Sequence, residues 1–214
     1  TPAATTPTRP RRSGSTAGEP FVVAVVGATA TGKSDLGIAL AQLLDGEVVS
    51  ADASQLYRGM DIGTAKVPLA QRHGIAHHQI DVLDVTDEAT IAGYQRHARA
   101  DVDAVLARGR VPVVVGGSGL YVRALPDHLA LPPPAPDVPQ RLGARAAAEG
   151  TAALLAELRE LDPVAAAAIE PNNTRRIVRA LEVIELTGRP FSATMPTRQT
   201  LRPTVFVGLR VDRE

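Results

Sequence analysis

The chain has 214 residues, of which 44% are hydrophobic, and its formal net charge is +0. This length and apolar content suit one domain with a real core and room for a small appended lobe. Zero net charge excludes a uniformly basic surface, so a nucleic-acid site must come from local clusters of Lys and Arg. The absence of Cys excludes disulfides and Cys-based metal sites. No apolar run approaches the roughly 20 residues of a membrane-spanning helix, so we expect a cytoplasmic protein without membrane contact.

The N-terminal half predicts a tail followed by alternating strands and helices. Residues 1–20 are rich in Thr, Pro, Ser and Gly, which is typical of a disordered tail. The apolar run 21–26 predicts a strand, and a helical pattern follows over about 33–44. Residues 47–50 predict the next strand, so the order indicates a right-handed parallel unit.

Further along, residues 79–85 predict another strand, 90–108 a helix, and 111–115 a fully apolar strand. Continuous apolar strands that alternate with helices are typical of a parallel sheet covered on both faces. We therefore predict an α/β fold with a parallel sheet and helices on both of its faces.

The character of the chain changes at residues 131–136, Leu-Pro-Pro-Pro-Ala-Pro, because successive prolines cannot continue a helix or a central strand. Residues 140–187 are rich in Ala, Leu, Glu and Arg and predict several short helices, and residues 204–209 predict a strand that returns to the sheet. We expect a core of residues 21–130 and 203–214, with a small all-helical lobe inserted at 131–202.

The strongest local signal is GATATGKS, which follows the first strand and opens the first helix. This is the pattern of a phosphate-binding loop, whose backbone N–H groups converge on an anion. Lys33 adds a positive charge, and Ser34 is placed to ligate Mg²⁺. The predicted diphosphate-binding residues are Gly27, Ala28, Thr29, Ala30, Thr31, Gly32, Lys33 and Ser34. The loop identifies a diphosphate but not the group attached to it.

Two other features bear on the function of the phosphate loop. Many ATP-hydrolysing proteins of this type end a later strand in Asp, which helps to hold Mg²⁺, but the strand 111–115 ends in Gly-Gly-Ser-Gly. This difference disfavours an ordinary ATPase or GTPase. Asp52 follows the second strand, at the sheet edge where α/β proteins bind ligands. It is either a general base or a turn-capping residue, and its position alone leaves both open.

His77 and His78 are adjacent, so on a strand they point to opposite faces and make a poor chelate. We favour one packed histidine and one with a polar contact over a metal site. Arg175, Arg176 and Arg179 gather near a helix N-terminus, where the helix dipole disfavours cations. This cluster either meets RNA phosphates or is a solvated face in which Arg179 pairs with Glu182 at i+3.

Several stretches together closely resemble the tRNA dimethylallyltransferase, or tRNA isopentenyltransferase, family, and they occur in the family's order. These stretches are GATATGKS, VVSADASQLYRGMDIGTAK, AHHQIDVLDV, VPVVVGGSGLYVRAL, LDPVAAAAI and NNTRRIVRALEVIELTGRP. The resemblance implies a P-loop NTPase-like core. Family members also continue past Glu214, so we expect that this chain lacks a C-terminal part.

The resemblance implies transfer of a dimethylallyl group from dimethylallyl diphosphate to N6 of the adenosine 3′ of the tRNA anticodon. The loop would hold the donor diphosphate with Mg²⁺, and Lys33 and Asp52 would be catalytic, with Asp52 as the base. The lobe would grip the anticodon arm of the tRNA, and we expect a monomer. The tRNA-binding residues implied by the family motifs are Asp52, Ala53, Ser54, Gln55, Ser118, Arg175, Arg176, Ile177, Val178 and Arg179.

Two other functions are compatible with parts of the pattern. A P-loop small-molecule kinase would use the loop for ATP and Asp52 as the base for a hydroxyl, and it would ignore tRNA. A tRNA-binding protein without catalysis would bind the anticodon arm in a salt-dependent way, and replacement of Asp52 would leave that binding intact.

Overall fold

A computed structural model describes residues 19–117, 119–127, 137–194 and 199–211. All but the last two residues of the expected tail lie outside these ranges, as does the Pro-rich stretch 131–136.

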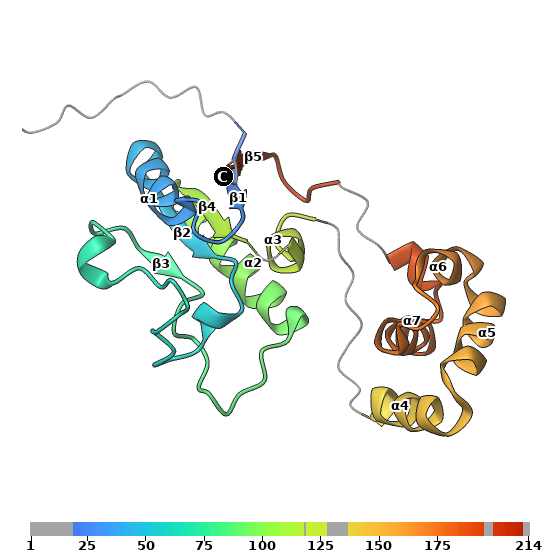
Figure 1. Ribbon diagram of the computed structural model, residues 1–214. Coiled ribbons are helices and arrows are strands. Elements are labelled where there is room, and N and C mark those ends of the chain that lie inside the picture. The colour runs from blue at the N-terminus through green and yellow to red at the C-terminus, as the bar shows by residue number, and fades with distance from the viewer. Residues whose placement is uncertain (1–18, 118, 128–136, 195–198, 212–214) are drawn as a thin grey trace, which may run out of the picture.

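The α/β part is built on one five-stranded parallel sheet with the strand order β3-β2-β4-β1-β5 (Figure 1). The strands are β1 (Val22–Gly27), β2 (Gly46–Ser50), β3 (His77–His78), β4 (Val111–Gly116) and β5 (Thr204–Leu209). In the centre of the sheet, Val25 lies between Val115 of β4 and Val207 of β5. The predicted parallel α/β sheet is confirmed.

Helices cover both faces of this sheet, as predicted. Side chains that alternate along β1 enter different cores: Val23 and Val25 join the core beneath α1 (Lys33–Leu44). Val22 and Ala24 join the core beneath α2 (Ile91–Ala107) and α3 (Gly119–Ala124). Because strand side chains point alternately to the two faces, a continuous Val run can serve both cores.

The strand expected over residues 79–85 is wrong. The strand β3 covers only His77 and His78, and Leu83 forms a single isolated bridge to Tyr57. Gln79 has φ 59° and Asp81 has φ 57°, so both adopt the left-handed conformation. This conformation turns the chain out of an extended ladder, which the apolar pattern did not reveal.

Residues beyond the Pro-rich stretch form a group of helices with a hydrophobic core of its own. The helices are α4 (Asp137–Glu149), α5 (Thr151–Leu161), α6 (Pro163–Ala168) and α7 (Thr174–Thr187). Leu154, Leu158 and Ile177 are fully buried in this core. The expected short helices are confirmed, and Asp162 caps α6 by accepting the Ala165 N–H at 3.0 Å.

The chain leaves and re-enters the α/β part at one place. The Leu201 N–H donates to the Pro126 carbonyl at 2.6 Å, and Asp127 forms an antiparallel bridge with Thr200. The segments that join this place to the helices lie outside the described residues, so the boundaries at 131 and 202 stay a prediction.

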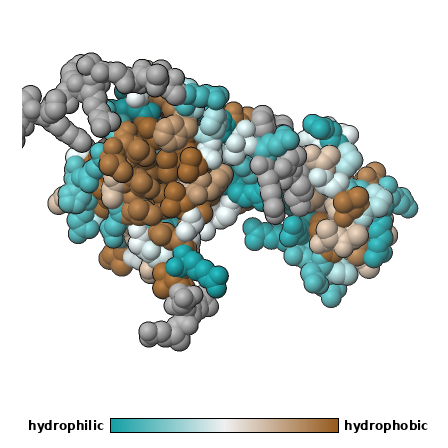
Figure 2. Space-filling model, turned by 90° about the horizontal axis from the view of Figure 1, so that it is seen from above, coloured by the Kyte–Doolittle hydropathy of each residue, from teal (hydrophilic) through white to brown (hydrophobic). Residues whose placement is uncertain are grey.

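A view from above shows a broad brown, apolar area on this face of the α/β part (Figure 2). The edge strand β5 contributes exposed apolar side chains on both faces, with Val205 53% and Phe206 50% exposed. Among the described helices, none is both long and apolar enough to cross a membrane.

Candidate active site

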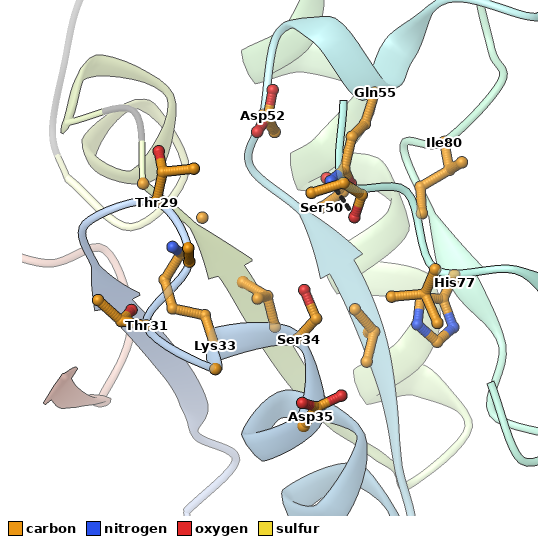
Figure 3. Close-up of a pocket in the computed structure, with 18 residues that line it drawn as sticks. Thr29, Thr31, Lys33, Ser34, Asp35, Ser50, Asp52, Gln55, His77 and Ile80 are labelled. Atoms are coloured by element: carbon orange, nitrogen blue, oxygen red, sulfur yellow. Dashed lines mark hydrogen bonds between the residues drawn. The ribbon is translucent and has the colours of Figure 1, made fainter. Parts of the chain in front are cut away.

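A cavity of about 470 Å³ lies at the carboxyl ends of β1, β2 and β4, which is the sheet edge where α/β proteins bind ligands. The phosphate loop forms one wall, and the segment after β2 forms the opposite wall (Figure 3). The polar lining residues include Thr29, Thr31, Lys33, Ser34, Asp35, Ser50, Asp52, Gln55 and His77. The structure thus brings Asp52 and the predicted loop residues 29–34 to one cavity, whereas Gly27 and Ala28 do not line it.

The phosphate loop is preshaped for an anion. Gly32 has φ 81° and stands at the N-cap of α1, where no side chain caps the helix. The N–H groups of the first helical turn are therefore available to a ligand, and the helix dipole favours a negative one. Thr31 Oγ1 donates to the Ala28 carbonyl at 2.9 Å, which folds the loop on itself.

Lys33 and Ser34 both face the cavity (Figure 3). Lys33 Nζ donates to the Ala28 carbonyl at 2.5 Å, so the ammonium lies against the phosphate loop. A phosphate bound by the loop could take the place of this carbonyl as the acceptor. The Ser34 hydroxyl is an oxygen ligand of the kind that Mg²⁺ accepts beside phosphate oxygens. The described residues contain no cluster of His, Asp and Glu able to hold a metal by itself. A Mg²⁺ bound at Ser34 would therefore need oxygen ligands from outside such a cluster, as the oxygens of a diphosphate could provide.

Asp52 lies across the cavity from the loop (Figure 3). Its Oδ1 accepts two hydrogen bonds from Ser54, one from the backbone N–H at 2.9 Å and one from the hydroxyl at 2.6 Å. These bonds form a local turn ahead of the short helix Ser54–Leu56, whose N-cap is Ala53, so the turn role of Asp52 is present. The other oxygen, Oδ2, has no hydrogen bond within the described part of the chain, which leaves it able to accept a proton.

Gln55, which lines the cavity with Asp52, connects the end of β2 to residues 64 and 65 by hydrogen bonds. Its Oε1 accepts from Ser50 Oγ at 2.8 Å, and its Nε2 donates to the carbonyls of Thr64 and Ala65 at 3.1 and 3.3 Å. The Ser50 carbonyl accepts from the Tyr94 hydroxyl at 3.0 Å. Burial raises the pKa of the Tyr94 phenol, so this hydroxyl remains a donor. A donor contact from Gln55 Nε2 to RNA would have to exchange one of these bonds, whereas Oε1 can accept one more.

The glycines after β4 bring backbone segments together. A Cβ on Gly116 would lie 2.4 Å from the Ala51 carbonyl oxygen, so this glycine is required for packing of β4 against the chain after β2. A Cβ on Gly117 would lie 3.6 Å from Lys33 Nζ, beside the phosphate loop. A second cavity of about 410 Å³ shares both glycines with the first, and Gly27 lines this second cavity. Ser118 lies outside the described residues.

The arginine cluster of α7 does not line either cavity. Arg175 and Arg176 are exposed, whereas Arg179 Nη1 donates to Glu182 Oε1 at 2.6 Å, as the solvated alternative predicts. Ile177 is fully buried in the lobe, and Val178 packs partly against the same core. The Ile177 side chain therefore cannot meet RNA without unpacking the lobe, and the role of Arg175 and Arg176 stays a prediction.

The two histidines have separate partners. His78 Nε2 lies 2.6 Å from Glu47 Oε2, which is the expected polar contact. His77 lines the active-site cavity, and its Nδ1 lies 2.9 Å from the Ile75 carbonyl, which can only accept. Burial lowers the pKa of His77, and the charges of Arg72 and His78 act in the same direction.

Sequence reasoning missed Lys66, whose ammonium closes a loop at the edge of the cavity. Its Nζ donates to the Tyr57 carbonyl at 2.5 Å, to Asp81 at 2.6 Å and to Asp61 at 3.0 Å. Although burial opposes the charge, the two carboxylates raise the pKa of Lys66. The fifteen-residue separation of Lys66 and Asp81 gives no local signal for this contact.

The fold and the site define a P-loop NTPase-like α/β protein with a phosphate-binding loop between β1 and α1. Residues 55–214 match the IPP transferase family model, and the chain belongs to this family. This membership confirms the resemblance found in the sequence and argues against the kinase alternative.

Curated relatives and solved structures agree with the family. The chain is 60% identical to a tRNA dimethylallyltransferase of Nocardia farcinica, over 90% of this chain and 61% of that protein. It is 60% identical to one of Kineococcus radiotolerans, over 92% of this chain and 65% of that protein. A crystal structure of a eukaryotic dimethylallyltransferase acting on tRNA matches with TM-score 0.76 and 29% identity, over 89% of this chain and 48% of that one. The chain thus spans less than two thirds of the length of these relatives.

Proposed function

We propose that this chain carries the reaction centre for transfer of a dimethylallyl group from dimethylallyl diphosphate to N6 of the adenosine 3′ of a tRNA anticodon. One observation carries the proposal: the phosphate loop, whose helix has no side-chain cap, lines the same cavity as Asp52, whose Oδ2 has no hydrogen bond to the described residues. The names of the relatives support the same reaction.

The loop accounts for the departure of the diphosphate. When the C1–O bond of the donor breaks, its electron pair goes to the diphosphate, which gains negative charge. The N–H groups at the start of α1 and the ammonium of Lys33 stabilise that charge. Mg²⁺ held by Ser34 and the phosphate oxygens would supply further charge neutralisation.

Asp52 takes the proton that the acceptor nitrogen must lose. The N6 nitrogen forms a bond to C1, and its surplus proton passes to Oδ2 of Asp52, while Ser54 keeps Oδ1 in place. The target base must leave its stack to reach this carboxylate, as in other enzymes that act on nucleobases. The exposed Arg175 and Arg176 of the helical lobe would contact phosphates of the anticodon arm.

The experiment is single-turnover transfer of labelled prenyl group to an anticodon stem-loop RNA by the protein as its gene encodes it. Asp52→Asn should slow transfer about 10²- to 10⁴-fold and leave donor binding unchanged. Asp45→Asn is the matched control, because Asp45 is exposed at the far end of α1 and its left-handed φ of 51° suits Asn. Normal transfer by Asp52→Asn would rule out the proposed base.

A further inference from the structure

The loop Tyr57–Lys66, which borders the active-site cavity, is a compact loop whose ends meet. Lys66 Nζ donates to the Tyr57 carbonyl at 2.5 Å, and Thr64 Oγ1 donates to the Met60 carbonyl at 2.7 Å. Gln55 holds the returning segment through the carbonyls of Thr64 and Ala65. The described contacts therefore fix this loop on both sides of its tip.

The tip nevertheless presents apolar side chains to water. Ile62 is 100% exposed, and Met60 is 40% exposed. Gly63 follows Ile62 with φ 76°, so the backbone turns sharply at the tip. An apolar side chain held in solvent by a fixed loop contributes nothing to the core. Covering it with a ligand is favourable, because apolar surface is removed from water.

The surroundings of the tip select the chemistry of that ligand. The ammonium of Lys66 is occupied by Asp61 and Asp81, and the guanidinium of Arg58 pairs with Asp84 at 2.8 Å. These two cations and three carboxylates carry a net charge of −1, which disfavours a phosphate beside Ile62 and suits the apolar face of a nucleobase better. Ala65, three residues after Ile62, lines the cavity, so the tip lies on a segment that continues into the site.

We propose that Ile62 packs against the nucleobase next to the target adenosine, where removal of that adenosine from its stack exposes a base face. Apolar side chains fill such gaps in other nucleic-acid complexes. This inference rests on the proposed function, because it requires an RNA acceptor in the cavity. It assigns Ile62 as a positioning residue for the acceptor and gives it no contact with the donor.

Steady-state transfer to an anticodon stem-loop RNA tests the proposal on the protein as its gene encodes it. Ile62→Ala should raise the KM for RNA about tenfold, with little change in kcat and none in donor affinity. Leu43→Ala is the matched control, because Leu43 is 75% exposed at the far end of α1. Wild-type KM in Ile62→Ala would overturn the proposal and leave the proposed function standing. If the wild-type protein itself transfers nothing, both fall.

A contact measurement gives independent evidence. With p-benzoylphenylalanine in place of Ile62, irradiation should cross-link the protein to a nucleotide adjacent to the target adenosine. The same probe in place of Leu43 should give no RNA cross-link. Cross-links from position 62 to the distant stem, or none to RNA, would overturn the proposal.

Discussion

At the scale of single residues, Ser54 determines how Asp52 is presented to the cavity. The Ser54 hydroxyl and backbone N–H both bind Oδ1 of Asp52, and Asp52 lines the cavity. The phosphate loop could be predicted from the sequence because its residues are contiguous. The sequence could not decide between base and cap for Asp52, because one carboxylate has two oxygens and the Ser54 contacts at Oδ1 do not exclude a separate role for Oδ2.

Ser54→Ala should lower kcat about tenfold, because it removes one of the two bonds that orient the carboxylate, each worth roughly 1.5–3 kcal/mol when an ion is involved. The KM for the prenyl donor should not change, since the phosphate loop is untouched. Steady-state transfer kinetics check this, and Ser54→Thr, which keeps a hydroxyl, should recover most of the rate. An unchanged kcat in Ser54→Ala would show that the backbone N–H alone positions Asp52.

At the scale of elements, Glu47 joins the start of β2 to β3 and to the segment that follows α2. The carboxylate is 3% exposed and accepts from Arg108 at 2.7 Å and from Arg110 at 3.2 Å, beside its contact with His78. Burial alone would raise the pKa of Glu47, but Arg108 and His78 outweigh it and lower the value from 4.5 to about 2. This network ties β2, β3 and the end of α2 together.

Because the folded-state pKa of Glu47 is lower than its ordinary value, its contribution is present above pH 4.5 and is lost as the pH falls toward 2. The shift corresponds to about 3 kcal/mol of unfolding free energy at pH 7. Denaturant unfolding at pH 7 and pH 3 should show a decrease for the wild type that is about 2 kcal/mol larger than for Glu47→Gln. Equal decreases in both proteins would contradict this assignment.

The strands and helices were predicted where one apolar pattern persists through an element, as in β1, β4 and α2. The pattern failed over residues 79–85, where left-handed residues interrupt the backbone. It also gave no sign of the loop closed by Lys66, because that loop depends on charges supplied from another segment. Local periodicity reports burial, and it does not report such long-range polar contacts.

At the scale of the whole molecule, the sheet and the helical part have separate hydrophobic cores. The sheet has hydrophobic clusters on its two faces, and α4 to α7 share a third cluster. The entry and exit of the helical part are held together by Pro126, Leu201 and the bridge between Asp127 and Thr200. If a short linker replaces the helical part and joins Asp127 to the segment that begins before Thr200, the sheet should therefore be preserved.

Replacement of residues 128–198 by a short Gly-Ser linker should leave binding of dimethylallyl diphosphate within about threefold of wild type. Affinity for the anticodon stem-loop should fall by more than tenfold, because the exposed Arg175 and Arg176 are removed. Calorimetry with the donor and a filter-binding assay with RNA measure the two effects. Loss of donor binding in a folded variant would show that the helices belong to the donor site.

We propose that the loop from Gly27 to Ser34 binds the diphosphate of a prenyl donor. Calorimetric titration with dimethylallyl diphosphate, and separately with ATP, both with Mg²⁺, tests it most directly. We predict binding of the prenyl donor that weakens at least tenfold in Lys33→Ala, since this change removes a charge-assisted contact to the diphosphate. Tight binding of ATP without any response to dimethylallyl diphosphate would contradict the account and favour a kinase.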